Sequence, residues 1–222
     1  MHSMTSLMNA AAPLAAFTFV MAITPGPNNL MLLTSGARFG LRRTTAHLVG
    51  ITLGFIGVML IAYAGVGTVI AAYPALTDVL TVACVLYLLW LGYQLLRESW
   101  SADEAAPADA AVTTGGARPQ TILQATLFQL VNPKGWGAAV TAAGIVTRDG
   151  LSPAISVLML LAVTAIVSPP CTVVWALFGA SLRPLLHRRA VRIGFSISMA
   201  VLILITAWWM AQPLLVQHAP RV

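Results

Sequence analysis

Charged side chains are scarce in this chain. Asp, Glu, Lys and Arg make up 8% of its 222 residues and hydrophobic residues 59%, whereas soluble domains carry about 25% charged residues. So few polar side chains cannot cover the surface of a soluble globule of this size. The mean hydropathy of +0.87 and the repeated apolar runs of membrane-spanning length, about 20 residues, predict an all-α integral membrane protein in a lipid bilayer.

Other classes of protein are excluded by what is missing. The apolar runs lack the roughly ten-residue alternation of an outer-membrane barrel. The net charge of +6 comes without a basic run suited to nucleic acid. The sequence has no His, Cys, Asp and Glu cluster with metal-ligand spacing, no glycine-rich phosphate loop and no nucleophile–base arrangement. We therefore expect no cofactor, no metal, no nucleic-acid partner and no enzymatic activity.

Lysine and arginine are absent before Arg38. The first apolar segment therefore lacks the positive region that opens a secretory signal peptide, and we interpret it as a retained helix. Only two cysteines occur, Cys84 and Cys171. Both fall in apolar runs, where a cysteine usually acts as a small buried hydrophobe.

Six apolar segments follow one another, at 7–36, 44–70, 75–96, 120–146, 153–182 and 191–215. Between the third and fourth lies "ESWSADEAAPADAAVTTGGARPQ", which has no apolar period and is typical of a flexible linker. The sequence therefore predicts a first three-helix repeat at 1–98, a flexible cytoplasmic linker at 99–119 and a second three-helix repeat at 120–222.

Arginine placement indicates the orientation of these helices. Only Arg148 and Arg221 lie on one side of the predicted membrane. Arginines collect in cytoplasmic loops, so the richer side is cytoplasmic and both termini are periplasmic. The nine arginines of that side are Arg38, Arg42, Arg43, Arg97, Arg118, Arg183, Arg188, Arg189 and Arg192.

An odd number of helices per half has a topological consequence. The second half enters the membrane upside down relative to the first, which is the inverted-repeat plan of many secondary transporters. The fourth segment then corresponds to the first. If the plan holds, helices 1 and 4 should both be broken at mid-membrane.

The first segment contains such a break in "TPGPNN". Pro25, Gly26 and Pro27 lie 11 to 13 residues before Arg38, roughly 16–20 Å from the cytoplasmic face at about 1.5 Å per residue. Proline removes a backbone donor and clashes with the preceding helical turn. The freed backbone groups cannot face lipid, so they must face protein or a watery cavity.

The fourth segment contains the matching break in "QLVNPKGWG". Lys134 lies 16 residues after Arg118 and 14 before Arg148, roughly 20 Å from either flank. Lys134 could extend along its stem to an interface, but a cation at this depth is costly and usually functional. Half-helices present N–H groups that attract a carboxylate and carbonyls that attract an ammonium. The paired breaks therefore suit a zwitterionic amino acid.

A family resemblance rests on these two stretches. The amino-terminal signature of the LysE/RhtB family of bacterial amino-acid exporters resembles "TPGPNNLMLLTSGARFGLRRTTAHLVGITLGF", residues 24–55. The family's second motif resembles "LFQLVNPKGW", residues 127–136, and the six-helix length and charged linker also match. The branch that exports cysteine and O-acetylserine is the most similar in "VVWALFGASLRPLL", residues 173–186.

The resemblance implies an inner-membrane exporter of cysteine, O-acetylserine, homoserine, threonine or similar compounds, driven by proton antiport with alternating access. The chain has no Asp or Glu well inside a helix, although proton-coupled carriers often use one. Either Lys134 itself exchanges the proton or a peripheral group does. Export of a metal ion or another small metabolite stays an alternative, as does a membrane thiol-redox carrier. A homodimer is also left open.

The resemblance also implies the site residues. Gly26 would allow close backbone approach, the asparagine amides can donate and accept hydrogen bonds, and Lys134 would attract the carboxylate. Outside the motifs, Ser168, Pro169 and Pro170 in "VSPPCT", together with Trp136, are candidates for a cavity wall or a hinge. The expected substrate-binding residues are Pro25, Gly26, Pro27, Asn28, Asn29, Asn132, Pro133 and Lys134.

One further pattern concerns packing. Gly50, Gly54 and Gly57 form a stripe of small residues in the second segment. Small residues let helix backbones approach closely within a membrane. The stripe predicts a close helix–helix contact.

Overall fold

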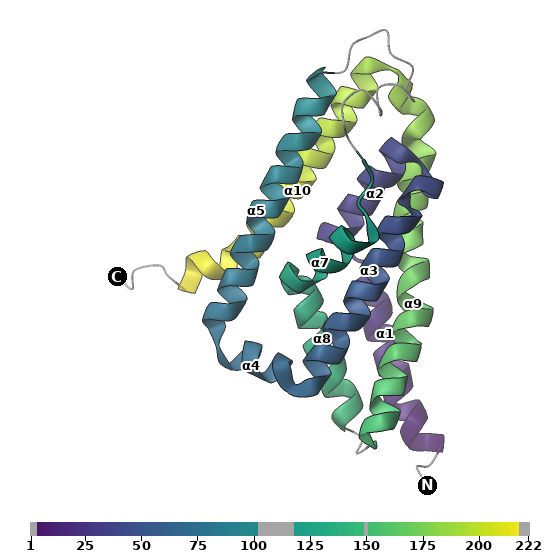
Figure 1. Cartoon of the computed structure of the whole chain (residues 1–222), viewed down its shortest axis with the longest axis vertical. Coiled ribbons are helices and arrows are strands. Elements are labelled where there is room, and N and C mark those ends of the chain that lie inside the picture. The colour runs from purple at the N-terminus through teal and green to yellow at the C-terminus, as the bar shows by residue number, and fades with distance from the viewer. Residues whose placement is uncertain (1–3, 102–117, 149–150, 218–222) are drawn as a thin grey trace.

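The computed structural model of this chain describes residues 4–101, 118–148 and 151–217, and all secondary structure within them is helical (Figure 1). Most of the predicted linker at 99–119 lies outside the described residues. Four helices are long and apolar enough to span a membrane, and a bent pair makes a fifth span if its two parts count as one. The four are Leu41–Val66, Ala75–Arg97, Pro153–Leu186 and Arg189–Leu214. The prediction of an all-α chain with several membrane-length helices is confirmed.

The bent pair forms the first apolar segment. Helix α1 (Met4–Ile23) ends before the prolines, and α2 (Pro27–Phe39) begins at Pro27 after a bend of 54°. Proline suits the first position of a helix because its missing N–H would have no partner there. Helix α2 ends at Gly40, whose φ of 76° is in the left-handed region that glycine adopts without strain. The break predicted at this "PGP" is therefore present.

The second segment forms a helix that bends near its end. Helix α3 (Leu41–Ile61) continues through the π-helical turn η1 (Ala62–Val66), in which Gly65 has a φ of 102°, and then into the short α4 (Gly67–Ala72). The predicted apolar segment at 44–70 corresponds to the span Leu41–Val66, and its last residues bend away because Gly65 turns the chain. Figure 1 shows α4 crossing the lower end of the molecule toward α5 (Pro74–Ser101).

The second half of the chain also has a broken segment. Helix α7 (Ile122–Val131) opens with a capping box, in which the side chains of Thr121 and Gln124 each accept from the other's backbone N–H. It ends at Asn132, and α8 (Pro133–Arg148) follows at once. The break predicted at "NPK" is therefore present. Neither part reaches spanning length alone.

Two long helices complete the fold. Helix α9 (Pro153–Leu182) leads through the 3-10 turn η2 (Arg183–His187) into α10 (Arg189–Gln217). Figure 1 shows α5 and α10 side by side along one edge of the molecule. Helix α9 packs against α1, α2 and α3, and α7 packs mainly on α3. The α7–α8 break is thereby held close to the α1–α2 break.

Glycines set the closest of these contacts. A Cβ placed on Gly36 of α2 would lie 2.1 Å from the Ala176 carbonyl oxygen of α9, and one on Gly179 would lie 2.0 Å from the Leu33 oxygen. Real Cβ atoms do not come this close, so the two backbones touch because neither glycine has a side chain. This contact fixes α2 against α9.

The outward surface is apolar, as lipid contact requires. Large hydrophobic side chains stand exposed along the long helices, for example Ile166 at 71% and Trp209 at 78%. Soluble monomers rarely expose broad apolar patches. Buried polar side chains, in contrast, occur inside the bundle, and those near the two breaks include Asn29, Gln129, Asn132 and Ser168.

Candidate functional site

The end of α1 is capped by side chains. Helix ends leave carbonyl groups without helical partners. The Asn29 amide, on α2, donates to the carbonyls of Ala22 at 2.9 Å and Thr24 at 2.7 Å. The Trp175 indole, on α9, donates to the Ile23 carbonyl at 3.2 Å. The broken backbone is thus satisfied inside the protein, as expected for irregular backbone at membrane depth.

Lys134 reaches across from the second break to the first. Its Nζ donates to the Thr24 carbonyl at 3.0 Å, to the Thr24 hydroxyl at 3.1 Å and to the Pro25 carbonyl at 3.2 Å. A helix C-terminus carries partial negative charge, so the half-buried ammonium is held by the end of α1. Gly26 makes room for this contact, since a Cβ there would lie 2.9 Å from the lysine Nζ.

A pair of side-chain amides joins α2 to α7. Asn28 Nδ2 donates to Gln129 Oε1 at 2.8 Å, and Gln129 Nε2 donates back to Asn28 Oδ1 at 3.1 Å. Gln129, fully buried, also donates to the Ala125 carbonyl at 3.0 Å. Each amide can donate and accept at once, so the pair is reciprocally satisfied.

Only the Nδ2 group of the Asn132 amide has a hydrogen-bond partner. Its Nδ2 makes a long contact of 3.5 Å with Gln129 Oε1. Its Oδ1 is buried and has no hydrogen-bond partner. A buried acceptor of this kind usually binds water or a ligand.

These groups surround a small cavity of about 60 Å³. A water needs about 10–15 Å³ by this measure, so the cavity has room for a few waters. Ordinary ligand pockets measure about 300–1,000 Å³, so this cavity is smaller than a usual small-molecule site. The lining residues are Met21, Ala22, Gly26, Pro27, Asn28, Asn29, Ile51, Phe55, Asn132, Lys134, Gly135, Ala138, Ser168 and Thr172.

Most of the residues expected from the two motifs meet at this cavity, and two stand beside it. Pro25 contributes its carbonyl to Lys134, and Pro133 begins α8. Trp136 is not part of the lining. It is buried in a hydrophobic cluster with Leu14 and Val58, and its indole donates to the Leu130 carbonyl at 2.9 Å.

The double proline of α9 does not interrupt its helix. Helix α9 runs unbroken through Pro169 and Pro170, which the sequence offered as a cavity wall or a hinge. The Thr172 hydroxyl donates to the carbonyls of Ser168 at 3.3 Å and Pro169 at 2.9 Å within the same helix. Ser168 and Thr172 line the cavity, whereas the two prolines do not.

Three polar groups of the site were missed from the sequence, namely Thr24, Gln129 and Thr172. Thr24 directly precedes the first break, and Gln129 lies three residues before Asn132 in an otherwise apolar run. A buried amide in such a run is costly unless it is paired. That cost is the signal that could have identified Gln129.

Other chemistry has little support. Among the described residues, no group of three or more His, Cys, Asp and Glu side chains could hold a metal ion. Cys84 and Cys171 are free and buried, on α5 and α9 respectively. They lie on helices that would not be equivalent in an inverted repeat.

Comparison with known proteins gives one family. The family described as "LysE type translocator" matches residues 19–211. The leucine efflux protein of Enterobacter sp. (strain 638) is 36% identical over 118 residues, which cover 52% of this chain and 53% of that protein. The cysteine/O-acetylserine efflux protein of Escherichia coli (strain K12) is 31% identical over 167 residues, covering 73% and 78%. No solved structure matches the chain.

Proposed function

Because the chain belongs to the LysE type translocator family, we propose that it exports small amino acids or their derivatives from the cytoplasm across the inner membrane. It is a transporter and not an enzyme. The relatives are named as efflux proteins for leucine and for cysteine or O-acetylserine. The substrate therefore belongs to this class, with cysteine, O-acetylserine, homoserine and threonine as the compounds to test first.

One observation carries the proposal, namely the contact of Lys134 with the end of α1. The ammonium and the first N–H groups of α8 are donors for a carboxylate. The carbonyls of Thr24 and Pro25 are acceptors for an ammonium. A zwitterionic amino acid can replace both sides of this contact, because its carboxylate binds Lys134 while its ammonium takes over the vacated carbonyls.

The substrate site in this proposal comprises Pro25, Gly26, Pro27, Asn28, Asn29, Asn132, Pro133 and Lys134. The partly unsatisfied Asn132 supplies a free acceptor oxygen for the substrate ammonium. Ser168 lines the same cavity from α9.

The six-span, inverted-repeat plan is part of the same proposal. The spans would be α1–α2, α3, α5, α7–α8, α9 and α10, in repeats at 1–98 and 120–222 joined by the linker at 99–119. Helix contacts support this plan. In the proposed repeats α1, α2, α3 and α5 are equivalent to α7, α8, α9 and α10. The contact of α3 with α7 then matches that of α9 with α1, and the contact of α2 with α9 matches that of α8 with α3. The equivalent helices α3 and α9 also pack on each other, as do α5 and α10.

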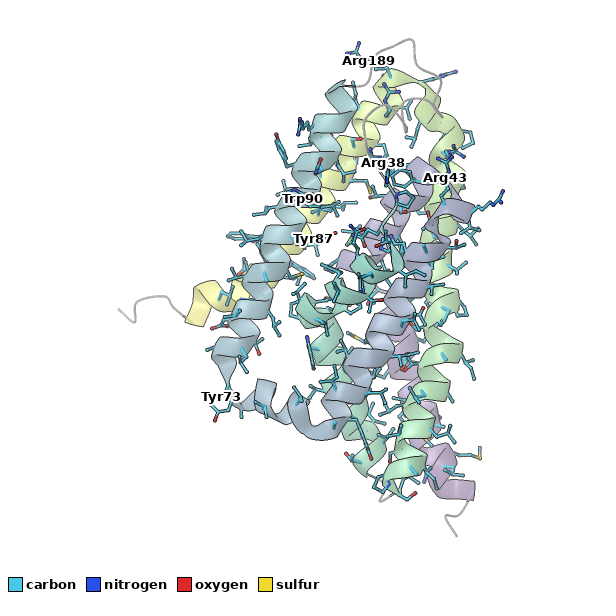
Figure 2. All side chains as sticks on the ribbon, in the orientation of Figure 1. Arg38, Arg43, Tyr73, Tyr87, Trp90 and Arg189 are labelled. Atoms are coloured by element: carbon cyan, nitrogen blue, oxygen red, sulfur yellow. The ribbon has the colours of Figure 1, made fainter. Side chains whose placement is uncertain are left out.

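Orientation follows from the arginines. Arg38, Arg43 and Arg189 lie toward the same end of the molecule, opposite Tyr73 (Figure 2). This distribution supports a cytoplasmic face there and periplasmic termini. A reporter enzyme active only in the periplasm, fused after Val222, should be active, whereas a fusion after Arg97 should be inactive. The reverse pattern would overturn the orientation.

Proton antiport and a homodimer complete the proposal. No carboxylate lines the described cavity, so Lys134 or a group outside the cavity would exchange the proton. Efflux unaffected by an imposed pH gradient would contradict antiport. No specific observation favours the metal-ion exporter or the thiol-redox carrier.

The deciding experiment uses everted membrane vesicles, in which the cytoplasmic face points outward and export is measured as uptake. Wild type is compared with Lys134→Met, which keeps the apolar stem, and Lys134→Arg, which keeps the charge. We expect selective uptake by wild type, loss of uptake in the Met variant and partial uptake in the Arg variant. Normal transport by Lys134→Met would remove the site from the proposal, and no transport of any amino acid by wild type would remove the function.

A further inference from the structure

The structure has a second and larger hollow besides the small cavity at the helix breaks, which we call the inner cavity. It is a groove of about 810 Å³ between α2, α5 and α7, with one wall completed by His47 of α3. This volume is within the range of about 300–1,000 Å³ found for small-molecule pockets. The inner cavity is far smaller, at about 60 Å³. We call this hollow the arginine groove, after Arg38 and Arg118 in its lining.

The arginine groove and the inner cavity follow one face of α2. Met31, Ser35 and Arg38 line the groove, and Asn28 lines the inner cavity. Helical positions three, seven and ten residues apart lie on nearly the same face. The groove therefore runs along α2 from Arg38, at the arginine-rich end, toward Asn28 at the break.

The amide pair of Asn28 and Gln129 stands between the two hollows. On α7, Phe128 and Val131 line the arginine groove, whereas Asn132 lines the inner cavity. Gln129 lies between them, fully buried and bonded to Asn28 in both directions. The pair therefore joins the helix that lines both hollows, α2, to α7 at the point where the lining passes from one hollow to the other.

The chemistry of the arginine groove suits a small polar anion or zwitterion. Besides the two arginines, its lining includes three side-chain amides, Gln94, Gln120 and Gln124. The Gln120 amide donates to the Tyr87 hydroxyl, and the Tyr87 ring packs on Phe128 with centroids 4.9 Å apart. In Figure 2, Tyr87 and Trp90 project from α5, while Arg38 lies near α2 and Arg43 lies on the side of α2 away from α5.

A buried side chain without a partner points to a ligand in the arginine groove. His47 lines it, is 1% exposed, and neither ring nitrogen has a hydrogen-bond partner. Buried polar atoms are nearly always paired with protein, water or a ligand. Its neighbours do not supply the partner, because the Ser35 and Thr44 hydroxyls bond each other at 3.0 Å.

We propose that the arginine groove is a separate binding site on the cytoplasmic side, which captures the carboxylate of the amino acid before the Asn28–Gln129 pair opens to the inner cavity. The proposal rests on the proposed export function. Arg38 and Arg118 attract the carboxylate, and His47 hydrogen-bonds the bound molecule. The site at the break then receives an amino acid already concentrated from the cytoplasm.

The test measures concentration-dependent uptake into everted vesicles by wild type, Arg38→Gln and Arg118→Gln. Arg43→Gln is the matched control, since it removes the same charge from the same end of the molecule without touching the groove. We expect each groove variant to raise the half-saturating concentration about two- to fivefold, as for an ion pair open to water, with a maximal rate close to wild type. The control should match wild type.

A carboxamide analogue of the transported amino acid, used as competitor, separates the outcomes. We expect the groove variants to weaken competition by the amino acid but not by its carboxamide. Equal weakening for both competitors would overturn the proposal, because the arginines would then not be recognising the carboxylate. Groove variants that behave like Arg43→Gln would overturn it while leaving the export function intact. A wild-type protein that transports no amino acid would remove both.

His47→Leu gives an independent readout. With no partner to lose, the variant should keep or raise the melting temperature of the substrate-free protein in detergent. It should reduce the rise in melting temperature that the amino acid produces, because ligand binding stabilises the folded state. A variant that melts well below wild type without substrate would assign His47 a structural role and overturn its part in the proposal.

Discussion

At the scale of single residues, the substrate-free site is occupied by the protein's own groups. The three oxygens of Thr24 and Pro25 hold the Lys134 ammonium, and two Asn29 contacts cap the end of α1. Hydrogen bonds to charged groups contribute about 1.5–3 kcal/mol each. A substrate must therefore replace contacts that already exist, and small displacements of Lys134 should change transport.

Gly26→Ala tests that displacement. The new Cβ would lie 2.9 Å from Lys134 Nζ and 3.0 Å from Cδ, and the lysine end can move aside. The backbone of Gly26 is extended, which alanine adopts freely. We expect near-normal yield and melting temperature with uptake lowered about tenfold, the loss that one charged hydrogen bond would give. Gly137→Ala, with no atom near its Cβ, is the control; equal uptake by both variants would refute the role of this contact.

We expect the contributions of Asn28 and Gln129 to the free energy of unfolding to be strongly coupled. Gln129→Ala removes both hydrogen bonds of the pair from the half-buried Asn28, whereas Asn28→Ala removes them from the buried Gln129, which keeps its bond to the Ala125 carbonyl. Each single substitution should lower the free energy of unfolding by about 1–3 kcal/mol. The double variant should lose less free energy of unfolding than the two single variants added together, and the difference should be about 0.5–3 kcal/mol. Denaturation of the four proteins in detergent measures this cycle. Additive losses would mean that the pair contributes nothing as a unit.

At the scale of helices, the glycine stripe on α3 divides into two kinds of position. A Cβ on Gly50 would lie 2.5 Å from the Ile122 carbonyl oxygen, and one on Gly54 would lie 2.6 Å from Gln129 Cγ and 2.7 Å from the Thr126 oxygen. Gly57 has no such neighbour. The predicted close packing therefore holds for the first two glycines, which let α7 approach α3, and not for the third.

Gly54→Ala should push α7 away from α3 and disturb Gln129. We expect a loss of about 1–3 kcal/mol in stability, typical of overpacking, together with reduced uptake. Gly57→Ala on the same helix should be neutral or stabilise by about 0.5–1 kcal/mol, because glycine weakens a helix interior. Melting temperatures in detergent compare the two. A Gly57 variant as unstable as the Gly54 variant would contradict the assignment.

Helix breaks marked by proline could be predicted from the sequence, whereas the turn at Gly65 could not. Pro27 and Pro133 each begin a new helix, so both breaks were evident. The turn at Gly65 lacks a proline, and glycine alone is tolerated within helices. Pro169 and Pro170 show the opposite case, because α9 continues through both prolines.

The site was predictable to a similar extent. Lys134 and the two proline-marked breaks were identified from their position in apolar runs, and the asparagines from the family resemblance. Their partners Thr24 and Gln129 were not, because a hydrogen bond across 101 or 110 residues depends on how the helices pack. Trp136 was expected at a cavity wall or hinge, but its aromatic ring packs in the hydrophobic core beside the site.

At the scale of the whole molecule, the two proposed repeats make contacts that do not depend on the linker. The pairs α2–α9, α3–α7 and α5–α10 all join the first half to the second. A linker mainly raises the effective concentration of the parts that it connects. The halves should therefore assemble without it.

We expect a chain divided between residues 102 and 117 to export amino acids when both halves are produced in one cell. Each half alone should be inactive, because Lys134 and the carbonyls that bind it lie on different halves. Efflux from intact cells and co-purification through a tag on one half measure the outcome. Activity of a single half would contradict the shared site, and failure of the halves to co-purify would contradict their assembly without the linker.

The Trp175 indole, bonded to the Ile23 carbonyl at 3.2 Å, gives this protein a built-in optical probe. Indole fluorescence depends on the polarity and hydrogen bonding around the ring, and this ring bridges α9 and the end of α1. If the other five of the six tryptophans are replaced by phenylalanine, the remaining emission reports on one helix junction. Stopped-flow fluorescence could then follow the opening of that junction in real time, without an attached dye.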